Sequence, residues 1–184
     1  MALGLGGNEV GHPPAPFAAD FARARDAGLH TVAHAGETTG HQTIRDSLDL
    51  LGVERIGHGI SAVENSGLVE RLARDRIPLE VCPTSNVCTG VAGSLASHPF
   101  PDLDAAGVLV TVNSDDPPLF GTTLTDEFLV LLHEWGYDAD NLQRIALNAV
   151  DVSFLPDSER ADLRRIFETE FAALRDELRI SLAG

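Results

Sequence analysis

Short apolar runs alternate with amphipathic segments along the first two thirds of the chain. The apolar runs predict strands over residues 2–5, 30–34, 54–58, 77–82 and 108–113. Between them, helical spacing of apolar residues predicts helices over 13–28, 43–51, 64–74 and 100–106, two of which end at Gly28 and Gly52. This strand–helix repeat of roughly 25 residues is typical of parallel βα units.

The last third of the chain has only helical periodicity. We expect helices over 125–135, 141–150 and 158–182, and we see no linker or low-complexity segment, so residues 1–184 predict a single domain. The last helix carries an apolar stripe that is more often core packing than a partner surface. The stripe consists of Leu163, Ile166, Phe167, Phe171, Leu174 and Leu178.

The number of strands leaves two α/β folds open. A closed (β/α)8 barrel needs eight parallel strands and typically ~250 residues, whereas this chain of 184 residues predicts five strands. The fold is therefore either an open doubly wound sheet or the C-terminal part of a barrel, from about its fourth strand to its eighth.

Composition and charge exclude several partners. The net charge is −15 and all 13 basic residues are arginine, which argues against nucleic acid and anionic membranes as partners and excludes a Schiff-base lysine. The longest apolar runs are strand-length and no leader pattern opens the chain, so a cytoplasmic protein is expected. Cys82 and Cys88 are expected to be free thiols, because their spacing fits no common zinc or redox motif.

Polar residues that suit a metal site stand at the ends of three predicted strands. His34 and Glu37 follow one strand, His58 ends the next between two glycines, and Asp115 and Asp116 follow the last. Together they are what a metal-assisted hydrolytic site needs. Each also has a plainer interpretation: a hydrogen-bonded structural histidine, a loop or capping carboxylate, or a turn into Pro117-Pro118.

Two further segments are expected to shape a pocket. Gly6-Gly7-Asn8-Glu9 could bring backbone close to a planar ligand, and residues 79–86 end a strand in polar side chains. The remaining histidines lack comparable partners and are interpreted as surface or structural residues, namely His12, His30, His41, His98 and His133.

Five ordered motifs resemble the adenosine deaminase family: Gly-Gly-Asn-Glu, His-Ala-Gly-Glu, Arg-Ile-Gly-His-Gly, Leu-Glu-Val-Cys-Pro-Thr-Ser-Asn and Asn-Ser-Asp-Asp-Pro-Pro. The resemblance spans nearly the whole chain. It implies the C-terminal part, about strands 4–8, of a zinc-dependent (β/α)8 barrel. Enzymes of this family hydrolyse the 6-amino group of adenine nucleosides to give inosine and ammonia, so a small-molecule purine nucleoside is the implied partner.

The resemblance also implies roles for single residues. His34 and Asp115 would be ligands of Zn²⁺, and Glu37 would be the general acid that protonates purine N1. His58 would hold and help deprotonate the attacking water. Asp116 would accept a hydrogen bond from substrate N7 and help orient the nucleophile, and Gly7 would contact the substrate through its backbone.

One departure from the family pattern is large. The family's first strand carries a His-x-His pair that supplies two metal ligands, and this chain has no such pair. The interpretations left open are a start codon placed too late, a deliberate truncation, a missing half supplied by another chain, and an inactive remnant. A non-catalytic purine-binding or assembly module is the alternative from another class, and the open edge near residues 2–5 would favour self-association.

The substrate also stays open at this stage. The segment Ile56-Gly57-His58 resembles the nucleoside-acting branch, because the adenine-acting branch tends to have an acidic residue where Gly57 stands. Adenosine is the first candidate, and a larger nucleoside such as aminodeoxyfutalosine is the second.

Overall fold

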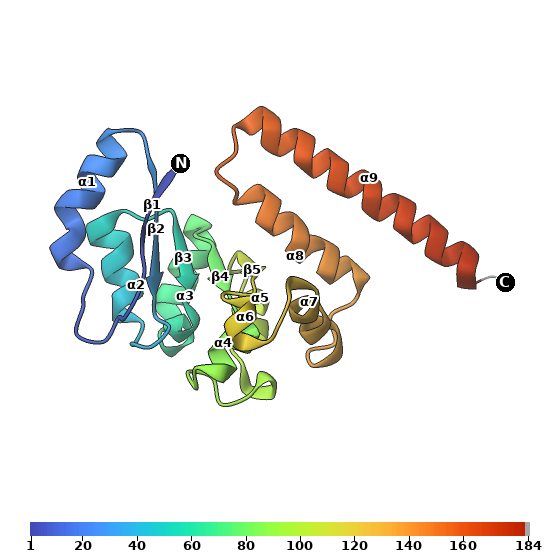
Figure 1. The fold of residues 1–184 in the computed structure, drawn as a ribbon, viewed down its shortest axis with the longest axis horizontal. Helices are drawn as coiled ribbons and strands as arrows, with labels where there is room; N and C mark the ends of the chain where they lie inside the picture. The colour runs from blue at the N-terminus through green and yellow to red at the C-terminus, as the bar shows by residue number, and fades with distance from the viewer. Residues whose placement is uncertain (183–184) are drawn as a thin grey trace.

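A parallel five-stranded sheet organises the first two thirds of the molecule (Figure 1). The computed structural model describes residues 1–182. Its strands are β1 (Ala2–Leu5), β2 (His30–Ala35), β3 (Arg55–His58), β4 (Leu79–Val81) and β5 (Val110–Val112). All five predicted strands are confirmed, although β4 and β5 are shorter than expected.

The strand order decides between the two folds that the sequence left open. The strands lie in the sheet in the order in which they occur in the chain, and every neighbouring pair is parallel. A doubly wound sheet would reverse its order at a switch point. The consecutive order is that of a (β/α) barrel, and it places the carboxyl ends of all five strands at one edge.

Helical segments follow each strand as the sequence predicts. They are α1 (Ala18–Asp26) after the short η1 (Ala15–Phe17), α2 (Gln42–Asp46) continued by η2 (Ser47–Leu51), α3 (Ser66–Asp75) after η3 (Ile60–Glu64), and α5 (Phe100–Ala105) after η4 (Leu95–Ser97). The sequence prediction missed α4 (Pro83–Cys88) and α6 (Pro117–Phe120). Both begin with proline, which suits the first turn of a helix, but both are too short for apolar periodicity to show.

The core lies between the sheet and these helices. Ala33, Ile56, Leu79 and Val110 from four neighbouring strands are completely buried. Near-continuous burial is what parallel strands covered by helices require. Helices contribute further buried side chains, namely Ile44, Leu51, Leu68, Leu72, Phe100 and Leu103.

Three helices close the chain: α7 (Leu124–His133), α8 (Ala139–Asp151) and α9 (Asp157–Leu182). Helix α8 packs on β5, where the Asn148 amide donates to the Val110 carbonyl at 2.9 Å. Helix α9 runs beside α8 and extends past it (Figure 1). No helix in residues 1–182 combines the length and the apolar character needed to cross a membrane.

The apolar stripe of α9 is only partly packed, which corrects the sequence-based expectation. Ile166, Leu174 and Leu178 are half or more exposed, at 55%, 50% and 61%. The reason is geometric, because α9 has helix α8 along one side and few other contacts. Helical periodicity predicted the element correctly, but it does not say how much of an apolar face is covered.

Candidate active site

His34 lies near the end of β2, held in place by a glycine on the neighbouring strand. Gly57 of β3 is the register partner of His34. A Cβ atom added to Gly57 would lie only 2.6 Å from Cδ2 of His34, well inside van der Waals contact. Gly57 therefore lets the imidazole lie flat over the strand, and any side chain at this position would displace it.

His58 ends β3 in a conformation that few residues adopt. Its φ is +61°, in the left-handed region, and its side chain is only 2% exposed. Its Nε2 lies 3.5 Å from Oε2 of Glu37 and 3.9 Å from Oδ2 of Asp115. The ring also meets the edge of His34, with the ring centroids 5.0 Å apart. Strained backbone of this kind is found where a fold fixes a functional side chain.

Asp115 follows β5 and shares the left-handed conformation, with φ of +56°. Ser85, on the unpredicted helix α4, donates its hydroxyl to Oδ2 of Asp115 at 2.7 Å. Ser85 is itself 1% exposed, so this hydrogen bond fixes the carboxylate from the buried side. The sequence prediction had assigned the segment containing Ser85 only a general role in shaping the pocket.

Glu37 is held by Glu9, whose segment the sequence analysis singled out without assigning this role. Oε2 of Glu9 accepts hydrogen bonds from the backbone N–H groups of Glu37 and Thr38, at 3.1 and 2.6 Å. Oε1 of Glu9 is buried without a hydrogen-bond partner. Burial, then the charges of Asp115 and Glu9, raise the pKa of the Glu37 carboxyl above its usual value. This loop thus favours a protonated Glu37.

Burial, followed by the proximity of His34, lowers the pKa of His58 to about 4. His58 is therefore neutral near pH 7, and its Nε2 faces the carboxylates of Glu37 and Asp115. Its other nitrogen, Nδ1, lies 3.2 Å from the side-chain amide of the buried Asn86.

Two predicted site residues lie outside this cluster. Asp116 is exposed, and its backbone carbonyl accepts the first hydrogen bonds of α6, from Leu119 and Phe120. It occupies the N-cap position without a side-chain capping bond, so the capping alternative is wrong for its carboxylate. Gly7, with φ of +117°, lines a separate cavity of about 200 Å³.

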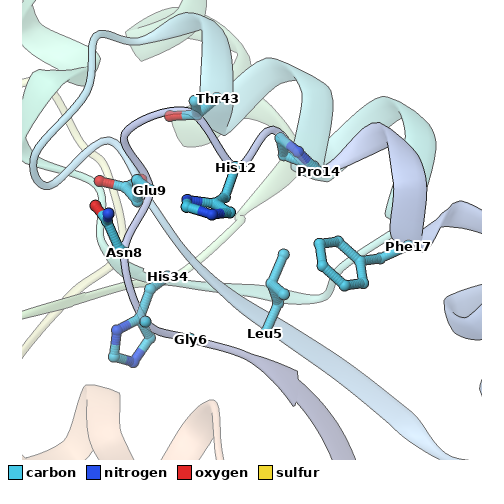
Figure 2. A pocket seen from close by; sticks show the side chains of 10 residues that line it. Leu5, Gly6, Asn8, Glu9, His12, Pro14, Phe17, His34 and Thr43 are labelled. Atoms are coloured by element: carbon cyan, nitrogen blue, oxygen red, sulfur yellow. The ribbon is translucent and has the colours of Figure 1, made fainter.

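His34 lines that cavity (Figure 2) and also belongs to the cluster, so the cavity and the cluster share this side chain. Figure 2 shows the His12 ring between Glu9 on one side and Phe17 on the other. A second cavity, of about 440 Å³, opens at the ends of β3, β4 and β5 and is lined by His34, His58 and Asp115. Both cavities are lined by apolar and polar residues together.

The cluster offers two overlapping sets of potential metal ligands, one containing His34 and the other containing Asp115, which share His58. Ligand atoms of His34, Glu37 and His58 all lie within 4.8 Å of one another, and so do those of His58, Cys82 and Asp115. Imidazole nitrogens and carboxylate oxygens are common zinc ligands. Burial raises the pKa of the Cys82 thiol, so Cys82 stays a neutral thiol next to the site. Both cysteines are free, as the sequence predicts, Cys82 buried and Cys88 exposed.

Consecutive parallel strands with a histidine–carboxylate cluster at their carboxyl ends are typical of the metal-dependent barrel hydrolases. The family model for adenosine deaminase matches residues 1–169, and the chain belongs to this family. Its five strands are the C-terminal part of the family's (β/α)8 barrel.

Relatives with three different names resemble the chain. An aminodeoxyfutalosine deaminase of Streptomyces avermitilis is 46% identical over 94% of the chain and 48% of its own length. An adenine deaminase of Streptomyces coelicolor is 44% identical over 91% and 49%. An adenosine deaminase of Salmonella typhi is 42% identical over 89% and 49%. The chain thus spans about half the length of these relatives.

Solved structures agree with the fold. An adenine deaminase from Arthrobacter aurescens superposes with a TM-score of 0.89 at 40% identity, over 94% of this chain and 52% of that one. An amidohydrolase from Burkholderia ambifaria, solved with bound zinc, gives the same TM-score at 29% identity, over 96% and 50%.

Proposed function

We propose that this chain carries most of the catalytic residues of a zinc-dependent deaminase that removes the 6-amino group of a purine nucleoside by hydrolysis. One observation carries the proposal: in a member of this family, His34, Glu37 and His58 converge within 4.8 Å at the ends of neighbouring parallel strands. The zinc-containing relative of similar fold supports the choice of metal.

His34 and Asp115 are the residues that we expect to hold the zinc ion. Bound zinc supplies Lewis acidity, which makes water a nucleophile near neutral pH. In this chain Gly57 leaves room for the His34 ring and Ser85 fixes one oxygen of Asp115, so both proposed ligands are oriented by neighbours. Such orientation of ligands typically changes metal affinity by 10–100-fold.

Glu37 is proposed to deliver a proton to purine N1. Attack at C6 removes the aromaticity of the ring, so N1 must receive a proton in the same step. The raised pKa of Glu37 keeps that proton available closer to neutrality than an ordinary carboxyl would.

His58 is proposed to hold and help deprotonate the attacking water through Nε2, which faces Glu37 and Asp115. Asp116, which lies exposed beside Asp115, is proposed to accept a hydrogen bond from N7 and help orient the nucleophile. Gly7 is proposed to contact the substrate through its backbone, because it lines the cavity next to His34.

For the substrate we propose adenosine or a larger nucleoside of the aminodeoxyfutalosine kind. Glycine at position 57 supports a nucleoside, because the adenine-acting branch of the family tends to have an acidic residue there. Relatives named aminodeoxyfutalosine deaminase and adenosine deaminase are similarly identical to the chain, at 46% and 42%, so we propose both nucleosides as substrates to test.

Three predictions from the sequence accompany this function. Residues 1–184 are proposed to form a single domain, the protein is proposed to be cytoplasmic, and the open edges at β1 and β5 are proposed to favour self-association. A non-catalytic purine-binding or assembly module remains the competing function, and such a module would need no zinc.

The test is to purify the protein from its natural source and measure its intact mass, zinc content and deamination of adenosine and larger 6-aminopurine nucleosides. We expect zinc-dependent release of ammonia from at least one nucleoside. A mass above 19.6 kDa would identify further polypeptide that completes the barrel. Absence of both zinc and deamination would overturn the proposal in favour of the module.

A further inference from the structure

A buried chain of hydrogen bonds runs away from the site behind His58. It links His58 at the end of β3, Asn86 on α4 and His98 just before α5, and these side chains are 2%, 0% and 4% exposed. Nδ1 of His58 lies 3.2 Å from Nδ2 of Asn86, and Oδ1 of Asn86 lies 3.2 Å from Nε2 of His98. The backbone N–H of Phe100 donates to Nδ1 of His98 at 3.0 Å.

The backbone N–H of Phe100 determines which group donates in each of these hydrogen bonds. A backbone N–H can only donate, so Nδ1 of His98 must accept and Nε2 must carry the proton of the neutral ring. His98 therefore donates to Oδ1 of Asn86. The amide group of Asn86 then donates to Nδ1 of His58, which leaves the His58 proton on Nε2.

The opposite direction is excluded by the same donor. If the Asn86 amide were turned over, its NH₂ would point at Nε2 of His98, and that nitrogen would have to accept. Both ring nitrogens of His98 would then be acceptors, which no protonation state of imidazole allows. A doubly protonated His98 fails as well, because its Nδ1–H would face the Phe100 N–H.

The surroundings of His98 keep it neutral. Its ring lies against the Trp135 ring, with centroids 5.5 Å apart. Burial lowers the pKa of His98 to about 4, so the ring is uncharged at pH 7. This role could not be predicted from the sequence, because His98 lies 12 residues from Asn86 and belongs to no local motif.

We propose that Asn86 and His98 are positioning residues that hold His58 with its proton on Nε2, so that His58 donates a hydrogen bond into the site and cannot ligate a metal through that nitrogen. By distance alone His58 could be a metal ligand, because it lies within 4.8 Å of the ligand atoms of His34 and Glu37 and of those of Cys82 and Asp115. A neutral histidine that binds a metal through Nε2 needs its lone pair there and a proton on Nδ1. The hydrogen bonds from Asn86 and His98 instead place the proton of His58 on Nε2 and the lone pair on Nδ1.

This inference rests on the proposed function only where it concerns what His58 donates to; the position of the proton does not depend on catalysis. A protonated Nε2 would hold the attacking water as an acceptor of a hydrogen bond. His58 could then take a proton from that water only after its own Nε2 proton has passed to the carboxylate of Glu37 or Asp115, whose oxygens lie 3.5 and 3.9 Å from Nε2.

The test is ¹⁵N NMR of the full chain labelled at histidine, at pH 7.5 and without metal. Protonated and unprotonated ring nitrogens have widely separated ¹⁵N shifts, and loss of one set of signals in His58→Gln assigns that residue. We expect the proton on Nε2 in both His58 and His98. A proton on Nδ1 of His58 in the unsubstituted protein would overturn the proposal.

Asn86→Asp provides a test that a merely structural role would not pass. A carboxylate of nearly the same shape can only accept, so it would draw the His58 proton to Nδ1 and free Nε2. We expect the two His58 nitrogen signals to exchange character in this variant and not in the control Asn141→Asp. An unchanged tautomer in folded Asn86→Asp would overturn the proposal.

Zinc ion then serves as a probe of the freed nitrogen. In the unsubstituted chain, added Zn²⁺ is expected to shift the nitrogen signals of His34 and leave the Nε2–H of His58 in place. In Asn86→Asp the Nε2 signal of His58 should shift as well. Loss of the His58 Nε2–H on zinc binding to the unsubstituted chain would contradict the proposal, whereas failure of the deamination assay would leave these NMR results unchanged.

Discussion

The two sides of the site are built in opposite ways. On one side, His58, Asn86 and His98 are neutral, almost completely buried and joined end to end by hydrogen bonds. On the other side, Glu9, Glu37 and Asp115 bring three carboxyl groups close together, and Oε1 of Glu9 is buried without a partner. We call these the relay side and the acidic side.

The difference separates what the protein fixes alone from what a ligand must complete. The relay side satisfies its own hydrogen bonds, so its geometry and proton positions follow from the fold. The acidic side concentrates like charges, which is costly unless a proton or a cation offsets it. Substitutions on the acidic side should therefore change chemistry and metal binding, and those on the relay side should change proton position and stability.

The largest expected effect is on the acidic side. Glu37→Gln keeps the shape of the side chain but removes the acidic proton, so we expect kcat to fall by about 10²–10⁴-fold. Steady-state deamination kinetics with the natural protein would measure this, with the exposed Glu70→Gln as a matched control. A fall of less than about tenfold would show that Glu37 is not the general acid.

The relay side should control stability at acid pH. The pKa of His98 is lowered from 6.5 to about 4, so the unfolded chain takes up a proton before the folded one does. The stability that comes from burying a neutral His98 is fully present above pH 6.5 and is lost as the pH falls toward 4. Between pH 7.5 and 4.5 the loss is about 2.5 kcal/mol in free energy of unfolding.

Urea unfolding of His98→Gln at both pH values tests this. The variant should be less stable at pH 7.5 but should lose about 2.5 kcal/mol less on acidification than the unsubstituted protein. The exposed His133→Gln should keep the original pH dependence. Equal pH dependence in all three proteins would mean that His98 is protonated alike in both states.

A smaller effect is expected where the proposed zinc ligand His34 meets Gly57. In Gly57→Ala the added methyl group would lie 2.6 Å from the imidazole, so His34 must move. We expect zinc affinity to fall by about 10–100-fold, measured by competition with a chromophoric chelator. Gly6→Ala is the matched control, because its Cβ would make an ordinary 3.9 Å contact with the same ring. Equal affinities in both variants would exclude His34 as a ligand.

The smallest effect is expected from Ser85→Ala. This change removes the hydroxyl that orients Asp115 but leaves the carboxylate in place. Zinc affinity should fall by about tenfold, the lower end of what oriented ligands lose. Thr89→Ala, at the opposite end of α4 and without a hydrogen bond to Asp115, should leave the affinity unchanged. A loss as large as that of Asp115→Ala would indicate collapse of α4 instead.

The strands and long helices were predictable because their apolar periodicity is local. Five strands and the helices that cover them follow from runs that a reader can find without knowing their neighbours. The order of strands in the sheet could not be read in the same way, since pairing depends on long-range contacts. The exposed stripe on α9 has the same explanation: the pattern fixes the helix and leaves its coverage open.

The site residues also fall into a predictable group and a group that depends on long-range contacts. His34, Glu37, His58 and Asp115 each lie at or just after the end of a predicted strand, so the topology alone brings them to one edge. The segments that hold their orienting partners were expected to shape a pocket, but the orienting roles were missed because they arise only in three dimensions. Ser85 and Asn86 lie on a helix too short to show periodicity, and Glu9 reaches the next strand's loop across 28 residues.

Zinc dependence of the natural protein tests the central claim most directly. The protein purified from its source should contain about one zinc ion per deaminase unit, lose activity when a chelator removes the metal, and regain it when zinc is restored. Deamination that persists at full rate after complete removal of zinc would contradict the account of His34 and Asp115 as parts of a metal site.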